Sequence, residues 1–351
     1  MRVVVTGASG NIGTSLLEAL ADEAAVSSVV GIARRRPSWA PPKVTWVEAD
    51  TATDDLDEHL RGADAVVHLA WIFQPTHDPL RTWRANVLGS LRLFDAAARA
   101  GVGALIHASS IGAYAPGPQE GFVDESWPTH ALPTAAYGRE KSYLERVLDA
   151  FELRHPQMRV VRMRPGFIFK RASAAEQRRL FAGPLLPNVL ARRGAIPIVP
   201  DLPGLRLQAL HSEDAADAFR RALVTDARGA YNIAADPVID ARSLADLLDA
   251  RVVRVPRGLV RTAIAGAWRL HAVPATPTLL DLALSLPAMD VTRAHEDLGW
   301  RPRYRSTEAI SAFLDGLRGV EGGDTPPLRA DAGGPLRWRE LATGVGRRDR
   351  L

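Results

Sequence analysis

The sequence predicts an α/β protein in which a doubly wound parallel sheet carries a smaller, discontinuous C-terminal lobe. Short runs rich in Val, Ile and Ala alternate with helical patterns through the first half of the chain. Such alternation builds a parallel sheet with helices on both faces. After Pro165 it gives way to a proline-rich stretch with little regular period. A chain of 351 residues is long enough for one large domain and a smaller lobe.

The expected elements follow the hydrophobic pattern in order. The apolar runs show little polar alternation, as in strands that are buried on both faces. We expect strands at Arg2–Thr6, Val29–Ala33, Val44–Glu48, Ala65–Ala70, Ala104–Ser109, Arg159–Arg164 and Ala230–Ala234. Helical spacing of apolar residues predicts helices at Ile12–Ala21, Asp54–Leu60, Leu80–Ala100, Thr134–Arg154, Ser243–Leu248 and Thr307–Leu317.

Composition argues against several classes of protein. The chain has no cysteine, which excludes disulfides and thiolate metal sites, and its histidines form no ligand cluster, so we expect no metal site. The net charge of +4 comes from scattered arginines without a nucleic-acid-binding motif. There is neither a signal-peptide pattern nor an uncharged apolar run of membrane-spanning length. We therefore expect a cytoplasmic protein with a small-molecule substrate and no nucleic-acid or membrane partner.

A glycine-spaced turn directly follows the first expected strand. Gly7 allows a tight turn, Gly10 lets the backbone approach phosphates, and Gly13 lets the next helix pack on the sheet. The N-terminus of that helix offers free N–H groups to a pyrophosphate. The pattern thus indicates a Rossmann-like dinucleotide site whose turn contacts are Gly7, Ser9, Gly10, Asn11, Ile12 and Gly13.

The ends of the next strands favour NADP as the cofactor. The second strand ends in Arg34 and Arg35, with no carboxylate for the adenosine ribose hydroxyls of NAD, and arginines suit a 2′-phosphate. NAD is the alternative. Asp50 and Thr51, after the third strand, are placed to meet the adenine. The pair Leu69–Ala70, after the fourth strand, is expected to pass close to the ribose and phosphates.

A tyrosine and a lysine indicate the chemistry. Tyr137 and Lys141 are four residues apart in an expected helix and share one face. Lys141 is one of only three lysines in an arginine-rich chain. A nearby ammonium is expected to lower the pKa of the phenol and make it an acid–base catalyst. Ser110 is placed to hydrogen-bond the reacting oxygen.

Together these patterns resemble the extended short-chain dehydrogenase/reductase superfamily, in its NAD-dependent epimerase/dehydratase group. The resemblance covers about residues 1–318 and also includes the segments His68-Leu69-Ala70, Asn86-Val87-Leu88-Gly89, Arg164-Pro165-Gly166, His211-Ser212-Glu213-Asp214 and Leu298-Gly299-Trp300. It implies that Tyr137 is the acid/base, that Lys141 binds the nicotinamide ribose, and that Ser110 orients the substrate oxygen. It also places Pro165 and Gly166 near the nicotinamide, and implies a homodimer through the helices at Leu80–Ala100 and Thr134–Arg154.

Two departures from the resemblance concern the substrate. Nucleotide-sugar enzymes of this group usually carry Asn where this chain has Phe167, and often Arg where it has Leu207, with Arg206 one place away. Trp71, Phe167 and Arg206 are the candidate substrate contacts. Apolar residues of the second lobe are expected either to line a pocket or to form the lobe's core: Leu185, Leu186, Val189, Leu190, Ile196 and Ile198.

The leading hypothesis is an NADP-dependent oxidoreductase acting on a carbonyl or secondary alcohol of a small apolar substrate. The alternatives are a nucleotide-sugar epimerase or dehydratase and a non-catalytic dinucleotide sensor. The expected division gives residues 1–165 to the NAD(P)-binding domain, with a contribution from about 205–235. It gives 166–204 and 236–318 to the substrate lobe and 319–351 to a flexible tail.

Overall fold

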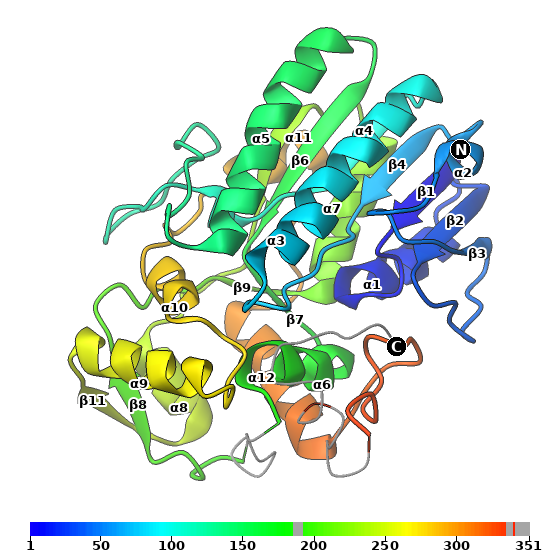
Figure 1. Ribbon diagram of the computed structural model, residues 1–351. Helices are drawn as coiled ribbons and strands as arrows, with labels where there is room; N and C mark the ends of the chain where they lie inside the picture. Colours follow the sequence, from blue (N-terminus) through cyan, green and yellow to red (C-terminus); the bar gives the residue numbers. More distant parts are fainter. Residues whose placement is uncertain (185–191, 335–339, 341–351) are drawn as a thin grey trace.

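A seven-stranded parallel sheet forms the body of the protein in a computed structural model, which describes residues 1–184, 192–334 and 340 (Figure 1). The strand order is β10-β6-β5-β4-β1-β2-β3, and all neighbours in it pair in parallel. The strands are β1 (Arg2–Thr6), β2 (Ser28–Ala33), β3 (Val44–Glu48), β4 (Ala65–His68), β5 (Ala104–Ala108), β6 (Arg159–Pro165) and β10 (Gly229–Ile233). The predicted doubly wound α/β fold is confirmed.

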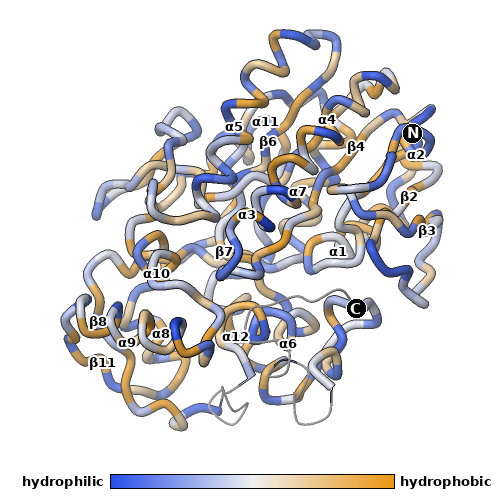
Figure 2. Tube along the Cα trace, viewed as in Figure 1, coloured by the Kyte–Doolittle hydropathy of each residue, from blue (hydrophilic) through white to orange (hydrophobic). Residues whose placement is uncertain are grey.

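Helices cover both faces of the sheet because successive residues of each strand point to opposite sides. Val3 and Val5 pack in a cluster with α1 (Asn11–Ala21), α7 (Ser212–Val224) and α11 (Thr292–Leu298). Val4 packs on the opposite face with α2 (Asp57–Leu60), α4 (Gly89–Arg99) and α5 (Ala136–Arg154). Both layers of side chains are apolar, which explains why the strands read as unbroken apolar runs. The covering helices carry both hydrophobic and hydrophilic stretches (Figure 2).

The expected helix Leu80–Ala100 is one uninterrupted helical stretch whose hydrogen-bonding pattern changes along it. It is divided into α3 (Pro79–Thr82), a π-helical stretch at Trp83–Leu88, and α4. The side chain of Asp78 caps α3 by accepting from the N–H of Arg81 at 3.1 Å. The π-helical stretch lies between α3 and α4 and packs against α5, which carries Tyr137 and Lys141. Such stretches are frequent near functional sites.

The second lobe contains two small parallel pairs of strands and several helices. Strand β7 (Phe167–Phe169) pairs with β9 (Ala209–His211), and β8 (Ile198–Asp201) pairs with β11 (Arg251–Arg254). The helices are α6 (Ala174–Gln177), α8 (Ala241–Leu248), α9 (Arg257–Arg269), α10 (Pro277–Ala283) and α12 (Ser306–Gly319). Among the residues described, no helix has the length and apolar character needed to cross a bilayer.

Candidate functional site

The glycine turn joins β1 to α1 and has the geometry that a dinucleotide needs. Gly7 has a φ of +68°, and a Cβ there would stand 2.6 Å from the backbone N of Ala70. A Cβ at Gly13 would collide with the carbonyl of Gly7. Contacts within the protein therefore require these two glycines. At Gly10 a Cβ would meet only the Gly7 carbonyl, at 3.3 Å, so much of the space beyond this residue is left to a ligand.

The N-terminus of α1 is suited to phosphate. Gly10 precedes the helix without a side-chain cap, and the first turn has no acidic residue. The first N–H groups of the helix therefore keep their partial positive charge for an anion. Asn11 donates from Nδ2 to the carbonyl of Ile168 at 3.1 Å, whereas its buried Oδ1 has no hydrogen-bond partner. These features fit a dinucleotide whose pyrophosphate lies over Gly10, Asn11 and Ile12.

The residues predicted for the adenosine end lie at the carboxyl ends of neighbouring strands. Arg34 and Arg35 lie just after β2 with largely exposed side chains. The pKa of Arg35 is lowered mainly by partial burial of its guanidinium and, to a smaller extent, by the positive charge of Arg34. After β3, the carboxylate of Asp50 accepts from the N–H of Ala52 at 2.9 Å. Ligands of parallel sheets bind at this edge, so these residues occupy one region around the turn.

The structure brings the three predicted catalytic residues together. Ser110 follows β5, and its hydroxyl accepts from the N–H of Gly112 at 2.9 Å; the ring of Tyr137 lies beside the same glycine. Tyr137 lies in the first turn of α5. One turn later, the Nζ atom of the buried Lys141 donates to the carbonyl of Ala108 at 2.6 Å. The group thus presents a phenol, a hydroxyl and an amine from two adjoining elements.

Burial dominates the electrostatics of this group. It raises the pKa of Tyr137 to about 12, although the hydrogen bond with Ser110 acts in the other direction. Burial also lowers the pKa of Lys141 to about 7, while the carboxylates of Glu140 and Glu145 raise it. The sequence-based expectation was a lowered pKa for Tyr137, and the structure gives a raised one. Burial of the phenol disfavours the phenolate more strongly than the neighbouring groups stabilise it.

The side chain of Asn86 holds the loop between β4 and α3 through two hydrogen bonds to Ile72, here called the clamp, and this loop carries aromatic side chains over Tyr137. The side-chain amide of Asn86 accepts from the N–H of Ile72 at 2.8 Å and donates to its carbonyl at 2.9 Å. It also donates to the carboxylate of Glu140 at 2.7 Å. On either side of Ile72, Trp71 packs edge-on against Tyr137 with centroids 5.8 Å apart, and Phe73 stacks on it at 5.0 Å.

An apolar chamber of about 260 Å³ opens beside Tyr137. Its walls come from the loop after β4, α3, the start of α5 and the second lobe. Five aromatic side chains lie among aliphatic residues and several threonines: Trp71, Phe73, Tyr137, Phe181 and Trp268. Among its lining side chains are two charged ones, Arg139 and Glu140. Of the described residues, this set contains the strongest candidates for contacts with a substrate.

Only one of the three predicted substrate contacts lines the chamber. Trp71 lines the chamber, but Phe167 and Arg206 are not among its lining residues. Phe167 packs in a cluster with Tyr137, and Arg206 donates to the carbonyls of Gln119 and Gly121 at 2.5 and 3.2 Å. Ile198 is 48% exposed and, like Ile196, lies away from the chamber. Leu185, Leu186, Val189 and Leu190 lie outside the described residues.

The remaining predicted contacts lie next to these groups. Leu69 donates from its N–H to the carbonyl of Thr6 at 3.1 Å and continues into Ala70, which closely approaches Gly7. Pro165 ends β6, and Gly166 donates to the carbonyl of Ile233 at 3.0 Å. A Cβ at Gly166 would collide with the carbonyl of Gln208, so the packing of the second lobe requires glycine here.

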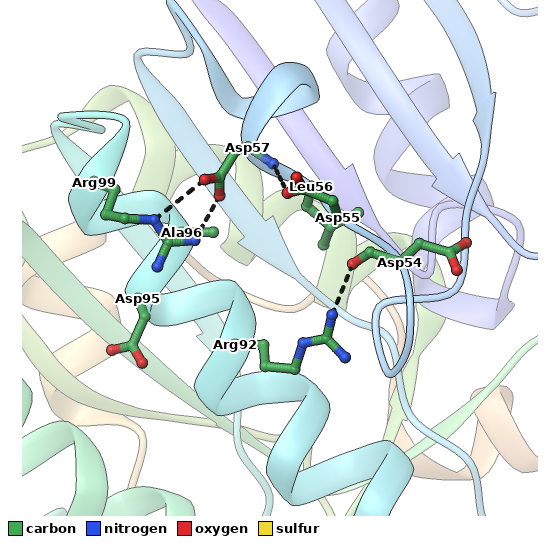
Figure 3. Close-up of a pocket in the computed structure, with 8 residues that line it drawn as sticks. All are labelled: Asp54, Asp55, Leu56, Asp57, Arg92, Asp95, Ala96 and Arg99. Atoms are coloured by element: carbon green, nitrogen blue, oxygen red, sulfur yellow. Dashed lines mark hydrogen bonds and ion pairs between the residues drawn. The ribbon is translucent and has the colours of Figure 1, made fainter.

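A second hollow, of about 250 Å³, lies between α2 and α4 (Figure 3). Several of its polar side chains are engaged with the protein: Asp57 pairs with Arg99 at 2.6 Å, and Arg92 donates to the carbonyl of Asp54 at 3.2 Å. None of the predicted site residues lines it. We assign it no role in catalysis.

Several residues of the site were missed at the level of sequence. Thr82, Phe73, Phe181 and Trp268 stand in no recognised motif, and only the fold brings them to the chamber. Glu140 stands within the motif Tyr137-Gly138-Arg139-Glu140-Lys141, and its acidic side chain immediately before the lysine was an available signal. Its buried carboxylate accepts from the hydroxyl of Thr82 at 2.6 Å.

Comparison with known proteins supplies a family match. The family model described as "NAD dependent epimerase/dehydratase family" matches residues 3–234. A structure of UDP-glucose 4-epimerase from Thermus thermophilus with NAD has a TM-score of 0.66 and 22% identity, and the match covers 91% of this chain and 99% of that one. At this identity the likeness shows the fold.

Relatives in sequence have varied names. An uncharacterised protein of Mycobacterium tuberculosis is 27% identical over 322 residues, 91% of this chain but 30% of that protein, so the chain spans under a third of its length. UDP-glucose 4-epimerase of Azospirillum brasilense is 32% identical over 154 residues, 42% of this chain and 43% of that protein. A 4-hydroxy-2-methyl-3-oxo-4-farnesyl-3,4-dihydroquinoline-1-oxide ketoreductase of Stigmatella aurantiaca is 30% identical over 173 residues, 48% of this chain and 51% of that protein.

Proposed function

Since this chain belongs to the NAD-dependent epimerase/dehydratase family of NAD(P)-dependent enzymes, we propose that it is an NADP-dependent oxidoreductase of a small apolar carbonyl compound or secondary alcohol. One observation carries the proposal: Tyr137, whose ring lies beside Ser110 and one helical turn before Lys141, is in the lining of an apolar chamber. A proton donor is thereby exposed to a space that suits an apolar ketone, aldehyde or alcohol.

Each residue of the group has a separate task. Tyr137 donates its phenolic proton to the substrate oxygen during reduction and accepts it during oxidation. Ser110 hydrogen-bonds the same oxygen and fixes its distance from the phenol. Lys141, when protonated, stabilises the phenolate that remains and contacts the nicotinamide ribose. The bound cofactor supplies or accepts the hydride at C4 of its nicotinamide.

The walls of the chamber favour an apolar substrate. A diphosphate is charged, and burying a charged group in apolar surroundings costs about several kcal/mol unless cations pair with it. Arg139 is the only cationic side chain among the described lining residues, and it is already bonded to the carbonyl of Pro133 at 2.7 Å. The Stigmatella relative, named as a ketoreductase of a farnesylated quinoline, is consistent with this class of substrate.

A nucleotide-sugar epimerase is the alternative. The Azospirillum relative and the Thermus neighbour carry that name, and Tyr137 and Lys141 serve such a reaction equally well. The same pair argues against a non-catalytic sensor, which has no use for a phenol and a buried amine in its pocket. A thermal-shift panel with NADPH present separates the two enzymes. Hydrophobic carbonyl compounds are expected to stabilise the protein; stabilisation by UDP- or dTDP-sugars that is lost in Arg139→Ala would establish the epimerase instead.

Turnover of Tyr137→Phe tests the catalytic assignment. The variant keeps the aromatic packing but lacks the transferable proton, so kcat should fall by about 10²- to 10⁴-fold on a carbonyl compound identified by that panel. Tyr143→Phe is the matched control, because Tyr143 is a 43% exposed residue of the same helix. A Tyr137→Phe variant with wild-type kcat would refute the role of Tyr137.

Cofactor preference is tested by titration. NADPH should bind more tightly than NADH, and Arg34→Ala should remove most of the difference, since a charge-assisted phosphate contact contributes about 1.5–3 kcal/mol, or roughly one to two decades of affinity. Equal affinities in the wild type would return NAD as the cofactor.

A further inference from the structure

Helix α9 lies on the surface of the second lobe, and none of its residues is buried. Figure 1 shows it away from the seven-stranded sheet. Near its end, Trp268 lines the chamber and donates from Nε1 to the hydroxyl of Thr76 at 2.9 Å. The other side of the helix is open: Leu259 and Leu270 are 65% and 81% exposed. A Cβ added at Gly266 would meet nothing within 4 Å.

The exposed apolar residues of α9 share one face. Positions 259, 263, 266 and 270 are four, three and four residues apart, which is the spacing of one side of an α-helix. Leu259, Ala263, Gly266 and Leu270 are here called the α9 stripe. Trp268 follows Leu259 by nine residues, or about two and a half helical turns, so it faces the opposite side. The helix thus turns one side to the chamber and the α9 stripe to solvent.

The stretch that contains α9 is strongly basic. From residue 250 to residue 280 there is no Asp or Glu, although these two types make up 40 of the chain's 351 residues. The same stretch carries five arginines: Arg251, Arg254, Arg257, Arg261 and Arg269. Asp281 pairs with Arg257 and Arg261, at 2.9 and 2.8 Å. Asp201 approaches Arg254 only to 3.8 Å. Five arginines against two pairing carboxylates leave a surplus of positive charge beside the apolar stripe.

This combination suits a lipid surface better than a protein. In a two-fold dimer a patch meets its own copy, so the surplus positive charge would face itself, which is unfavourable. Binding energy between proteins is concentrated in residues such as Trp, Tyr and Arg that are seated in pockets, whereas the α9 stripe consists of two leucines, an alanine and a glycine. An anionic bilayer offers acyl chains to the stripe and phosphate groups to the arginines.

We propose that α9 docks this protein on an anionic lipid bilayer, with the α9 stripe at the acyl boundary and the flanking arginines among the headgroup phosphates. A helix of this kind lies in the plane of the interface and does not cross it. The proposal differs from the sequence-based expectation of no membrane partner, which considered only signal and spanning segments. It does not depend on the reaction proposed above. If that reaction is right, docking brings the chamber close to a phase in which an apolar substrate dissolves.

Co-sedimentation of the full-length chain with lipid vesicles tests the docking. Wild type should bind vesicles of phosphatidylcholine mixed with phosphatidylglycerol, and bind pure phosphatidylcholine at least about tenfold more weakly. Leu259→Ser combined with Leu270→Ser should weaken binding to the mixed vesicles about tenfold or more, because the apolar contact is lost. Arg251 and Arg269 are exposed and form no ion pair with a described residue. Arg251→Gln combined with Arg269→Gln should weaken the same binding about tenfold or more.

Two controls match these variants in chemistry but lie elsewhere in the chain. Phe122→Ser replaces an apolar side chain that is 55% exposed. Arg61→Gln combined with Arg301→Gln removes as many positive charges from exposed positions as the α9 arginine variant does. Both controls should bind the mixed vesicles as wild type does, and circular dichroism verifies that every variant is folded.

Three results would overturn the proposal. The first is a wild type that does not sediment with the mixed vesicles. The second is binding that both α9 variants retain, or that the controls lose equally, because then any exposed apolar or basic residue would account for it. The third is a wild-type dimer, measured by light scattering, that becomes monomeric in the Leu259→Ser, Leu270→Ser protein, because a second copy of the chain would then cover the α9 stripe.

Discussion

The Nζ atom of Lys141 lies 3.4 Å from the centroid of the Trp71 indole ring. The same ammonium donates to the carbonyl of Ala108. The indole ring and this carbonyl leave Lys141 almost fully buried. The buried Nε1 of Trp71 has no hydrogen-bond partner. A cation–π contact of this kind contributes about 1–2 kcal/mol when it is desolvated. For Lys141 to reach the hydroxyls of a nicotinamide ribose, Trp71 has to leave this position.

Displacement of Trp71 is therefore the first prediction. Addition of NADP⁺ should change the tryptophan emission of the wild type, because the indole moves away from the ammonium. Most of the change should be lost in Trp71→Phe, while binding itself, measured by calorimetry, persists. Trp300→Phe, at a tryptophan that lies in no predicted site and whose Nε1 donates to the carbonyl of Asp214, serves as control and should keep the change. The same emission change in Trp71→Phe would show that Trp71 stays in place.

The second prediction concerns pH. Since burial lowers the pKa of Lys141 to about 7, its ammonium is lost in the free enzyme as the pH rises through that value. The value of kcat/KM for carbonyl reduction should therefore fall above about pH 7. Glu140 raises the pKa of Lys141, so Glu140→Gln should move the midpoint to lower pH. Asp95→Asn, an exposed carboxylate on α4, should leave it unchanged; identical midpoints in all three proteins would exclude Lys141 as the titrating group.

The sequence contained enough to predict the fold and the approach of Ser110, Tyr137 and Lys141 to one another. The turn at Gly7 and the pair of Tyr137 and Lys141 are local patterns, because each is set by one turn or one helical repeat. Strands β1 and β3 have the predicted bounds, since apolar runs buried on both faces mark strands clearly. Helix ends were less accurate: the helix predicted from Asp54 begins at Asp57, after a turn in which Asp54 and Asp55 bond backbone N–H groups.

The chamber and the contact of Thr325 with the glycine turn could not be predicted in this way. Phe181 and Trp268 reach the region of Tyr137 only through the packing of the second lobe, and no local pattern encodes that approach. Thr325 stands in a segment rich in Gly and Pro, yet it bonds Ser9 across 316 residues of sequence. Composition measures how much apolar surface a segment can bury by itself, and it says nothing about a single polar contact with a distant turn.

The third prediction concerns the clamp by Asn86. Asn86→Ala removes both bonds to Ile72 and frees the loop in which Phe73 stacks on Tyr137. Loss of this positioning should lower kcat/KM by about one to two decades, because misplacement of a substrate wall by even about 1 Å is costly. Thr82→Val is the control: it removes one bond to Glu140 and leaves the clamp intact, so its effect should be much smaller. Equal effects of the two variants would show that the clamp has no positioning role.

The fourth prediction concerns the buried ion pair behind the catalytic group. Glu145, fully buried, accepts two bonds from Arg164 at 2.9 Å and one from the hydroxyl of Ser109, the neighbour of Ser110. Glu145→Gln leaves the buried guanidinium without a counter-charge, which should reduce the free energy of unfolding by about 3–5 kcal/mol. Asp149→Asn, whose carboxylate is 49% exposed and pairs with Arg162, should cost about 1 kcal/mol or less.

The difference in unfolding free energy between wild type and Glu145→Gln should depend on pH. Burial alone would raise the pKa of Glu145, but its bonds to Arg164 outweigh burial and hold the pKa below the ordinary value of 4.5. The ionised carboxylate therefore contributes stability above that value, and the contribution is lost as the pH falls through the folded-state pKa. Urea unfolding of wild type and Glu145→Gln should show a difference in unfolding free energy that is full at pH 7 and shrinks as the pH falls below the ordinary pKa of 4.5. A difference that stays constant across this range would mean that packing, rather than charge, makes Glu145 important.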